Sequence, residues 1–165
     1  MDLQSDLMPS IYEEKKVLQQ CIRIAKIATL LGVPIVGTEQ SPQSLGNNAA
    51  EITPFCEQMI SKEYFDGRQN GLVNVLSKNR EHLIFAGCET HVYVMQTALE
   101  RLRQNFRVSI LVDAVGSRRP LDRDIALHRL ASASAIFLTT EMLAFEWLGS
   151  AENPLFKEAL GIIKS

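Results

Sequence analysis

The stretch HLIFAGCETHVYVMQTALE, from His82 to Glu100, decides the fold. Its first half contains an unbroken apolar run, Leu83–Ala86, which is typical of a strand buried on both faces of a parallel sheet. In its second half, apolar residues recur at steps of three and four, which is typical of the buried side of an amphipathic helix: Val92, Met95, Leu99 and Leu102. Between the halves, Gly87–His91 joins a strand's carboxyl end to a helix N-terminus. Open α/β sheets place ligands there, because backbone N–H groups are left unpaired.

Length and composition exclude several classes of protein. With 165 residues, 46% of them hydrophobic, the chain fits a single domain over 1–165. Its 17 basic and 19 acidic residues form no basic run, so we expect no nucleic-acid partner. No apolar segment approaches the roughly 18 residues of a membrane span. The start, with Asp2 and Asp6, lacks a signal peptide's basic region, so we expect a cytoplasmic protein without a membrane partner. The three cysteines have no CxxC spacing, which argues against a disulfide framework or a zinc knuckle.

Strand and helix patterns alternate along the rest of the chain. We expect strands at 33–38, 59–62, 107–113 and 134–138, and helices at 11–31, 71–78, 121–131, 140–148 and 154–163. A polar loop at 39–48 follows a strand and is a candidate for one wall of a functional site. A turn is expected at 65–67. The pattern predicts a three-layer α/β/α, Rossmann-like domain with a mostly parallel sheet of about five to six strands.

Short motifs recur in a fixed order over nearly the whole chain. They are Asp2-x-Gln4, Gly32–Val36, Thr38-Glu39-Gln40-x-Pro42, Leu45-Gly46, Lys62, Gly87-x-Glu89-Thr90-x-Val92-x-Val94-x-Gln96-Thr97-Ala98, Asp113-Ala114 and Pro154–Glu158. Each motif is weak alone. Their order and spacing together resemble the isochorismatase-like cysteine hydrolase superfamily, and within it the small isochorismatase domain-containing proteins.

The resemblance implies an acid–lysine–cysteine triad at the carboxyl ends of the strands. Asp2 falls on the family's general acid or base, and Lys62 on the lysine that stabilises the aspartate or a developing negative charge. Backbone N–H groups of Glu89 and Tyr93 are the implied oxyanion donors. The substrate pocket is assigned to Gln4, Glu39, Gln40, Phe65 and His91. The resemblance also implies a cis peptide at Cys88–Glu89 and a homo-oligomer using the helices from Leu121 to Leu148. We expect no cofactor and no metal, because no histidines share a ligand spacing with a carboxylate.

Tyr93 stands where the family has its cysteine nucleophile. A phenol with a pKa near 10 is a poorer nucleophile than a thiol with a pKa near 8.5. Cysteine-dependent amide hydrolysis is therefore not expected. The resemblance still allows chemistry through Asp2, because isochorismatases proper cleave a vinyl ether by aspartate protonation. Two hypotheses follow: a small-molecule hydrolase without a cysteine nucleophile, or a catalytically degenerate member that serves in binding or assembly, a pseudoenzyme.

The second departure from the family lies at the start. The family's central strand precedes the aspartate, and here only Met1 does. We expect that the true N-terminus precedes Met1, because an absent central strand exposes the backbone edges of both neighbours. If the strand is absent, Asp2 is expected to be a frayed terminal residue without a catalytic role.

Several candidate residues also have simpler explanations. Without the resemblance, Asp2 and Lys62 are surface charges. Cys88 could be a relocated nucleophile, although a lone cysteine more often fills apolar space. His91 could contact a substrate or cap the helix, and we favour the cap. The remaining charged candidates are expected at the surface, although the two arginines could bind an acidic substrate: His82, His128, Arg118 and Arg119.

Overall fold

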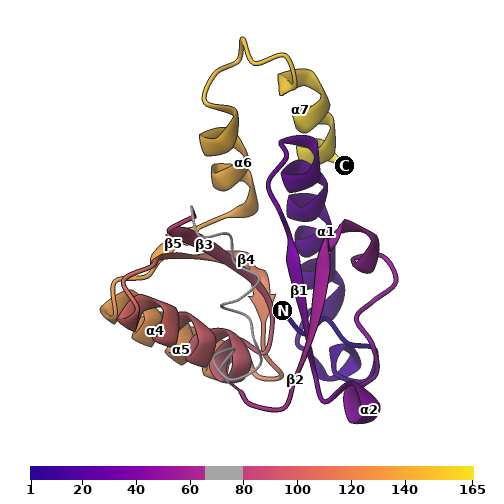
Figure 1. Cartoon of the computed structure of the whole chain (residues 1–165), viewed down its shortest axis with the longest axis vertical. Helices are drawn as coiled ribbons and strands as arrows, with labels where there is room; N and C mark the ends of the chain where they lie inside the picture. The colour runs from indigo at the N-terminus through magenta and orange to yellow at the C-terminus, as the bar shows by residue number, and fades with distance from the viewer. Residues whose placement is uncertain (66–79) are drawn as a thin grey trace.

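Parallel strands with helices on both faces confirm the predicted α/β class. The structure, a computed structural model, describes residues 1–65 and 80–165. The predicted helix at 71–78 and most of the predicted turn at 65–67 lie outside the described residues. In Figure 1, α4 (Met95–Arg103) and α5 (Pro120–Ser132) cover one face of the sheet that contains β4 (Arg107–Gly116). The opposite face packs against α1 (Glu14–Leu30) and α6 (Thr140–Leu148).

The five strands of the described residues form two parallel sheets instead of one. β1 (Val36–Gln40) pairs with β2 (Gln58–Lys62). The second sheet has the order β3-β4-β5, where β3 is His82–Cys88 and β5 is Ile136–Leu138. The predicted strand at 33–38 was placed too early, because β1 begins at Val36 and continues into the predicted polar loop as far as Gln40. The predicted strand at 107–113 was too short, because β4 continues to Gly116. Glu39 and Gln40 are therefore strand residues.

The first residues of the chain join the two sheets at the carboxyl ends of their strands. The Asp2 N–H donates to the Thr38 carbonyl at 3.1 Å. On the other side, the Met1 nitrogen donates to Ala86 at 2.6 Å and the Cys88 N–H donates to Met1 at 2.9 Å. This alternation is the pattern of a parallel ladder. Asp2 is 0% exposed, so the expectation of a frayed Asp2 in the absence of a preceding strand is wrong.

Gly87 makes this close approach feasible. Its φ is +113°, and a Cβ added there would lie 1.9 Å from the Met1 carbonyl oxygen. A side chain at this position would therefore collide with the backbone of the N-terminal segment. The Cys88–Glu89 peptide that follows is cis, as the resemblance implied.

The two faces of β4 supply two hydrophobic cores. Val108 and Ile110 pack with Val94, in the turn after β3, and with α5, whereas Leu111 and Ala114 pack with α1 and α6. The period of two places Val108 and Ile110 on one face and Leu111 on the other, and the register shift between Phe85 and Gly87 in the pairing with β3 interrupts this period before Ala114. The remaining helices are the short α2 (Pro42–Leu45) and α7 (Phe156–Lys164), which packs on α1. None of the helices in the described part of the chain has an apolar run long enough to cross a bilayer.

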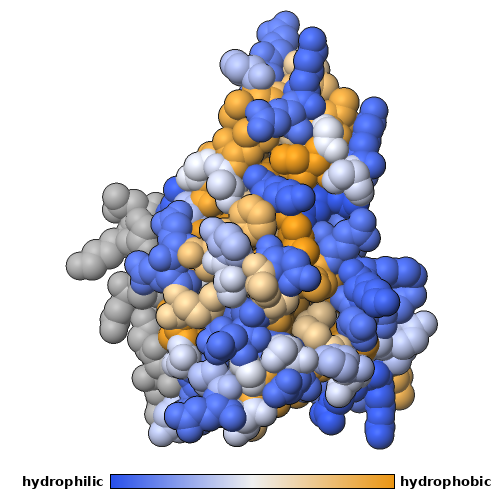
Figure 2. Space-filling model, turned by 90° about the vertical axis from the view of Figure 1, so that its right-hand side faces the viewer, coloured by the Kyte–Doolittle hydropathy of each residue, from blue (hydrophilic) through white to orange (hydrophobic). Residues whose placement is uncertain are grey.

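Figure 2 shows the face that carries α1 and α7. In its upper half, where α6, α7 and the end of α1 lie, apolar side chains reach the surface between charged ones. The fold therefore leaves apolar surface away from the carboxyl ends of the strands, where the candidate site lies.

Candidate functional site

A buried ion pair lies at the carboxyl ends of β1 and β2. The Lys62 Nζ lies 2.5 Å from the Asp2 Oδ2, and the two side chains are 1% and 0% exposed. β2 ends at Lys62, and the N-terminal segment brings Asp2 to the same edge. Burial lowers the pKa of Lys62, and the Asp2 carboxylate opposes that shift. Residues that are 60 positions apart in the sequence thus form one buried ion pair.

Two β1 side chains hold this pair in place. The Thr38 hydroxyl donates to the Asp2 Oδ1 at 2.6 Å, so both carboxylate oxygens have a partner. The Gln40 Oε1 accepts from the Lys62 Nζ at 3.0 Å, and its amide nitrogen donates to the Glu63 carbonyl at 2.9 Å. A buried charge without such partners would be unstable, so Thr38 and Gln40 fix the geometry of the acid and the lysine.

Tyr93 covers the pair from the turn that follows β3. The Lys62 Nζ lies 4.2 Å from the centroid of the Tyr93 ring, a cation–π contact that leaves no room for a substrate atom between them. Phe65, itself 51% exposed, packs edge-on against Tyr93 with the ring centroids 5.6 Å apart. The structure therefore brings Asp2, Lys62, Tyr93 and Phe65 together.

The acidities of nearby groups do not favour a covalent nucleophile. Burial raises the pKa of Tyr93, and the charges of Asp2 and Glu89 raise it further. Cys88 is 0% exposed, and burial raises the pKa of its thiol strongly. A nucleophile must lose its proton near neutral pH, which neither group does readily. The geometry thus favours the apolar packing role for Cys88 over the relocated nucleophile.

The turn after β3 carries the candidate oxyanion donors and a second ion pair. Glu89 precedes a π-helical turn, Thr90–Val94, at whose N-terminal end backbone N–H groups lack intrahelical partners. The Glu89 Oε1 accepts from the Arg118 Nε at 2.8 Å, although the Arg118 side chain is 57% exposed. Arg118 is therefore a neighbour of the site and not merely a solvated loop residue.

Three of the predicted pocket residues are occupied by contacts within the protein. Both ends of the Gln4 amide bind backbone: the Gln40 N–H and carbonyl at 2.8 and 2.9 Å, and the Gly46 carbonyl at 2.6 Å. The Glu39 Oε1 accepts from the Asn48 N–H at 2.8 Å. The His91 Nδ1 lies 3.0 Å from the Ser117 hydroxyl. These side chains brace the loops around the pair.

Sequence reasoning gave no role to Thr38 and favoured a solvated Arg118. Thr38 belongs to a quoted motif, and its position two residues before Gln40 on a strand puts both side chains on one face, a signal that could have identified it. The Arg118–Glu89 contact joins residues 29 positions apart and leaves no local signal. Asp113 lies elsewhere, where its carboxylate accepts from the Thr140 N–H at 2.9 Å at the start of α6. No three His, Cys, Asp or Glu side chains of residues 1–65 and 80–165 gather as metal ligands.

Comparison with known proteins supports the same family. The isochorismatase domain profile matches residues 1–142. Isochorismatase domain-containing protein 2A of Mus musculus is 34% identical over 169 residues, which cover 99% of this chain and 80% of that protein. Isochorismatase family protein 1A of Dictyostelium discoideum is 33% identical over 164 residues, which cover 94% of this chain and 80% of that protein.

A solved structure described as MAR1 ribonuclease from Caenorhabditis elegans superposes with a TM-score of 0.94 at 29% identity, covering 99% of this chain and 86% of the other. The Escherichia coli YcaC gene product shares the fold, with a TM-score of 0.86 at 19% identity over 99% of this chain and 89% of the other. On the strength of the profile match and of these relatives, the chain belongs to the isochorismatase-domain family.

Proposed function

We propose that the protein is a small-molecule hydrolase that works through Asp2 and Lys62 without a covalent nucleophile. The observation that carries this proposal is the fully buried pair, in which Lys62, Thr38 and Gln40 hold a carboxylate at the carboxyl edge of a parallel sheet. A protein that only needs to fold has little use for such a pair, because burying two charges contributes little net stability. Both residues fall on the positions that the sequence resemblance implies for the family's acid and lysine.

The chemistry follows from the acidity of the pair. When Asp2 takes the proton from Lys62, the two buried charges are replaced by two neutral groups, and burial already favours neutral Lys62. Protonated Asp2 can then give its proton to the electron-rich carbon of a vinyl ether, and water adds to the cation that forms. The added water gives up a proton, which returns to the Asp2–Lys62 pair, and the hemiketal then breaks its C–O bond to release the alcohol and leave a carbonyl product. Because solvent does not reach Asp2, the substrate must displace the Tyr93 ring from its contact with Lys62.

One observation favours a second candidate function, a catalytically degenerate protein used in binding or assembly. The Tyr93 ring occupies the space above Lys62, and Phe65 supports it from outside. In that case the ion pair has no catalytic role, and the Tyr93 ring never leaves its contact with Lys62. The two functions differ in whether any substrate is turned over.

The experiment is a turnover screen of the native protein and of Tyr93→Cys. The substrates are isochorismate, small amides and esters, and a short RNA, since a structural relative is described as a ribonuclease. We expect the native protein to cleave isochorismate or a similar vinyl ether and to leave amides intact. Tyr93→Cys should gain amidase or esterase activity that Lys62→Met abolishes, because an acid–base pair activates a thiol. If both folded proteins turn over nothing, the hydrolase proposal is wrong and the binding function replaces it.

We further propose a homo-oligomer. Large apolar side chains are exposed on α5 and α6: Leu121 at 70%, Ile125 at 63%, Met142 at 49% and Phe145 at 40%. The YcaC gene product, which shares the fold, is described as an octameric hydrolase. Exposed apolar side chains of this kind mark contact surfaces. At micromolar concentration, light scattering should give a molar mass larger than that of one chain. Ile125→Lys should lower this molar mass. A monomeric native protein would contradict the proposal.

A further inference from the structure

Two sulfur atoms converge on Gly37 of β1. Met59 of β2 pairs with Gly37, and Cys56 lies two residues before the start of β2. A Cβ added at Gly37 would lie 2.6 Å from the Met59 Sδ and 3.0 Å from the Cys56 Sγ. The two sulfurs are therefore no farther apart than these two distances together. A side chain at this position would push them away from the strand, so the glycine allows the thiol and the thioether to share one space.

This pair of sulfurs is separate from the Asp2–Lys62 site. Successive side chains of a strand point to opposite faces, so Gly37 faces away from Thr38 and Gln40, which hold the ion pair. Met59 is 37% exposed and Cys56 is partly exposed. Within the described residues, neither side chain belongs to the two hydrophobic cores on β4. The two sulfurs thus meet at the surface of the β1–β2 sheet and not in a packed core.

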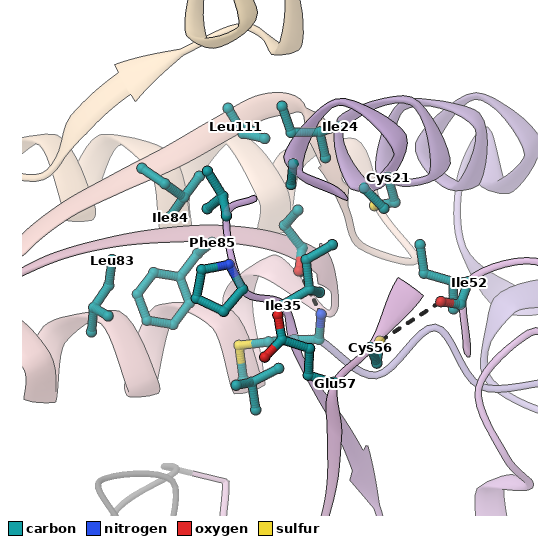
Figure 3. A pocket seen from close by; sticks show the side chains of 18 of the residues that line it. Cys21, Ile24, Ile35, Ile52, Cys56, Glu57, Leu83, Ile84, Phe85 and Leu111 are labelled. Atoms are coloured by element: carbon teal, nitrogen blue, oxygen red, sulfur yellow. Dashed lines mark hydrogen bonds between the residues drawn. The ribbon is translucent and has the colours of Figure 1, made fainter. Parts of the chain in front are cut away.

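The Cys56 thiol makes a weak hydrogen bond and lies near a carboxylate. Figure 3 shows Cys56 beside Ile52, at the border of a cavity of about 520 Å³ between β1 and β3, and the dashed line joins its Sγ to the Ile52 carbonyl oxygen at 3.7 Å. Burial raises the pKa of Cys56, and the charge of Glu39 raises it further. The carboxylate that opposes loss of the thiol proton attracts a cation. A cation that takes the place of this proton on the sulfur offsets both effects.

Asn48 brings a buried oxygen without a partner to the same place. The Asn48 Nδ2 lies 3.2 Å from the Met59 Sδ and donates to the Thr38 carbonyl at 2.9 Å. Asn48 is only 8% exposed, and in the part of the chain that the structure describes its Oδ1 has no hydrogen-bond partner. A buried carboxamide oxygen normally has a partner, and a bound ion is one of the groups that can supply it. The amide of Asn48 therefore adds an oxygen ligand next to the two sulfurs.

We propose that Cys56 and Met59 form a binding site for Cu(I), with the Asn48 Oδ1 as a further ligand. Thiolate and thioether are soft ligands, which select Cu(I) over hard cations such as Mg²⁺ and Ca²⁺. The flexible Met59 side chain can rotate to place its sulfur opposite the Cys56 Sγ across the ion. On binding, the S–H bond breaks, the proton goes to solvent, and the copper stays Cu(I), so no oxidant is needed. This proposal does not depend on the hydrolase function.

The test is a titration of the native protein with Cu(I), supplied as its coloured bicinchoninate complex under argon. Binding removes Cu(I) from the chelator, so the loss of colour reports the affinity. Met59→Leu keeps much of the side-chain volume but removes the thioether, and it should weaken binding at least about tenfold. Cys56→Ser should abolish it. The matched control is Met142→Leu, at a methionine of α6 that is 49% exposed, which should bind Cu(I) as the native protein does.

Alkylation locates the ion in the native protein. Bound Cu(I) should slow the modification of Cys56 by iodoacetamide at least about tenfold, because the ion occupies the sulfur, and mass spectrometry measures the rate. If Met59→Leu binds Cu(I) as tightly as the native protein, the thiol acts alone and the proposal is wrong. If Cys56 reacts at the same rate with saturating Cu(I) as without it, the ion binds elsewhere and the proposal is also wrong. Should Cys56→Ser not fold, this protection assay decides.

Discussion

The gap between β1 and β3 has two ends with opposite character. At the carboxyl end, Met1 and Asp2 close it with main-chain hydrogen bonds, and the buried Asp2–Lys62 pair has a partner for each polar atom described above. At the amino end, the same two strands face a cavity of about 520 Å³ with apolar walls. One pair of strands thus supports a closed polar site and an open apolar space.

The two ends differ in which groups supply the polar contacts. Asp2 is buried completely although its side chain is charged. The reason is that Lys62, Thr38 and Gln40 supply the polar contacts from β1 and β2, so the N-terminal segment needs only to deliver the carboxylate. The cavity is lined mainly by apolar side chains, with Glu57, Gln58, Arg80 and His82 also among its lining residues.

The largest effect should come from breaking the closed end. Lys62→Met preserves much of the side-chain volume but leaves the Asp2 carboxylate buried without its cation, which should cost about 3–5 kcal/mol of unfolding free energy. Lys16→Met is the matched control, since the Lys16–Glu13 pair is exposed and should contribute nothing measurable. Urea denaturation compares the two variants. Equal denaturation midpoints would mean that the Asp2–Lys62 ion pair does not stabilise the folded protein.

The junction between the two ends should be the next most sensitive position. Gly87→Ala forces a side chain into a left-handed backbone conformation and against the Met1 carbonyl, so it should cost about 3 kcal/mol. Gly149→Ala, at a φ of +70° with no atom near the added Cβ, should cost only about 1 kcal/mol. Thermal unfolding of both variants gives the difference. If Gly149→Ala is the more damaging of the two, Met1 is not packed on β3 as described.

Cysteine reactivity distinguishes the two ends chemically. Cys88 lies at the closed end and is fully buried, whereas Cys56 lines the cavity and is partly exposed. Burial raises the pKa of Cys21 to about 12 and raises that of Cys88 further, so we expect iodoacetamide to modify Cys56 at least about tenfold faster than either. Mass spectrometry of the native and the denatured protein measures the rates. Rapid native modification of Cys88 would restore it as a candidate nucleophile.

The smallest effect should be the pH dependence at Tyr93. Its pKa is raised from 10.0, chiefly by burial, so above about pH 10 the unfolded chain loses the phenol proton before the folded protein does. Proton release then favours unfolding, and stability should fall as the pH rises through this range. Tyr93→Phe should lessen the fall; Lys62 acts with the opposite sign but is present in both proteins and cancels. Identical pH profiles would mean that the phenol is not buried against the pair.

Much of the fold was predictable because the strongest signals are local. The apolar run at Leu83–Ala86 and the amphipathic spacing after it predicted β3 and the helix that follows. Gly32 marked the end of α1. The division into two sheets was not predictable, since strand pairing joins distant residues. At the site, the motif positions of Asp2 and Lys62 led to a real contact. The ring of Tyr93 over Lys62 and the Glu89–Arg118 pair required the packing of β2 against the turn after β3, which no local pattern contains.

The most direct test of the central claim, that Asp2 is the acid of a working site, is the turnover of isochorismate by two isosteric variants. Asp2→Asn keeps the shape of the side chain but cannot exchange a proton, so kcat/KM should fall by about 10²–10⁴-fold. Tyr93→Phe keeps the ring over Lys62 and should stay within a few-fold of the native protein. Circular dichroism confirms that both variants are folded. Full activity in Asp2→Asn, or its loss in Tyr93→Phe alone, would contradict the account.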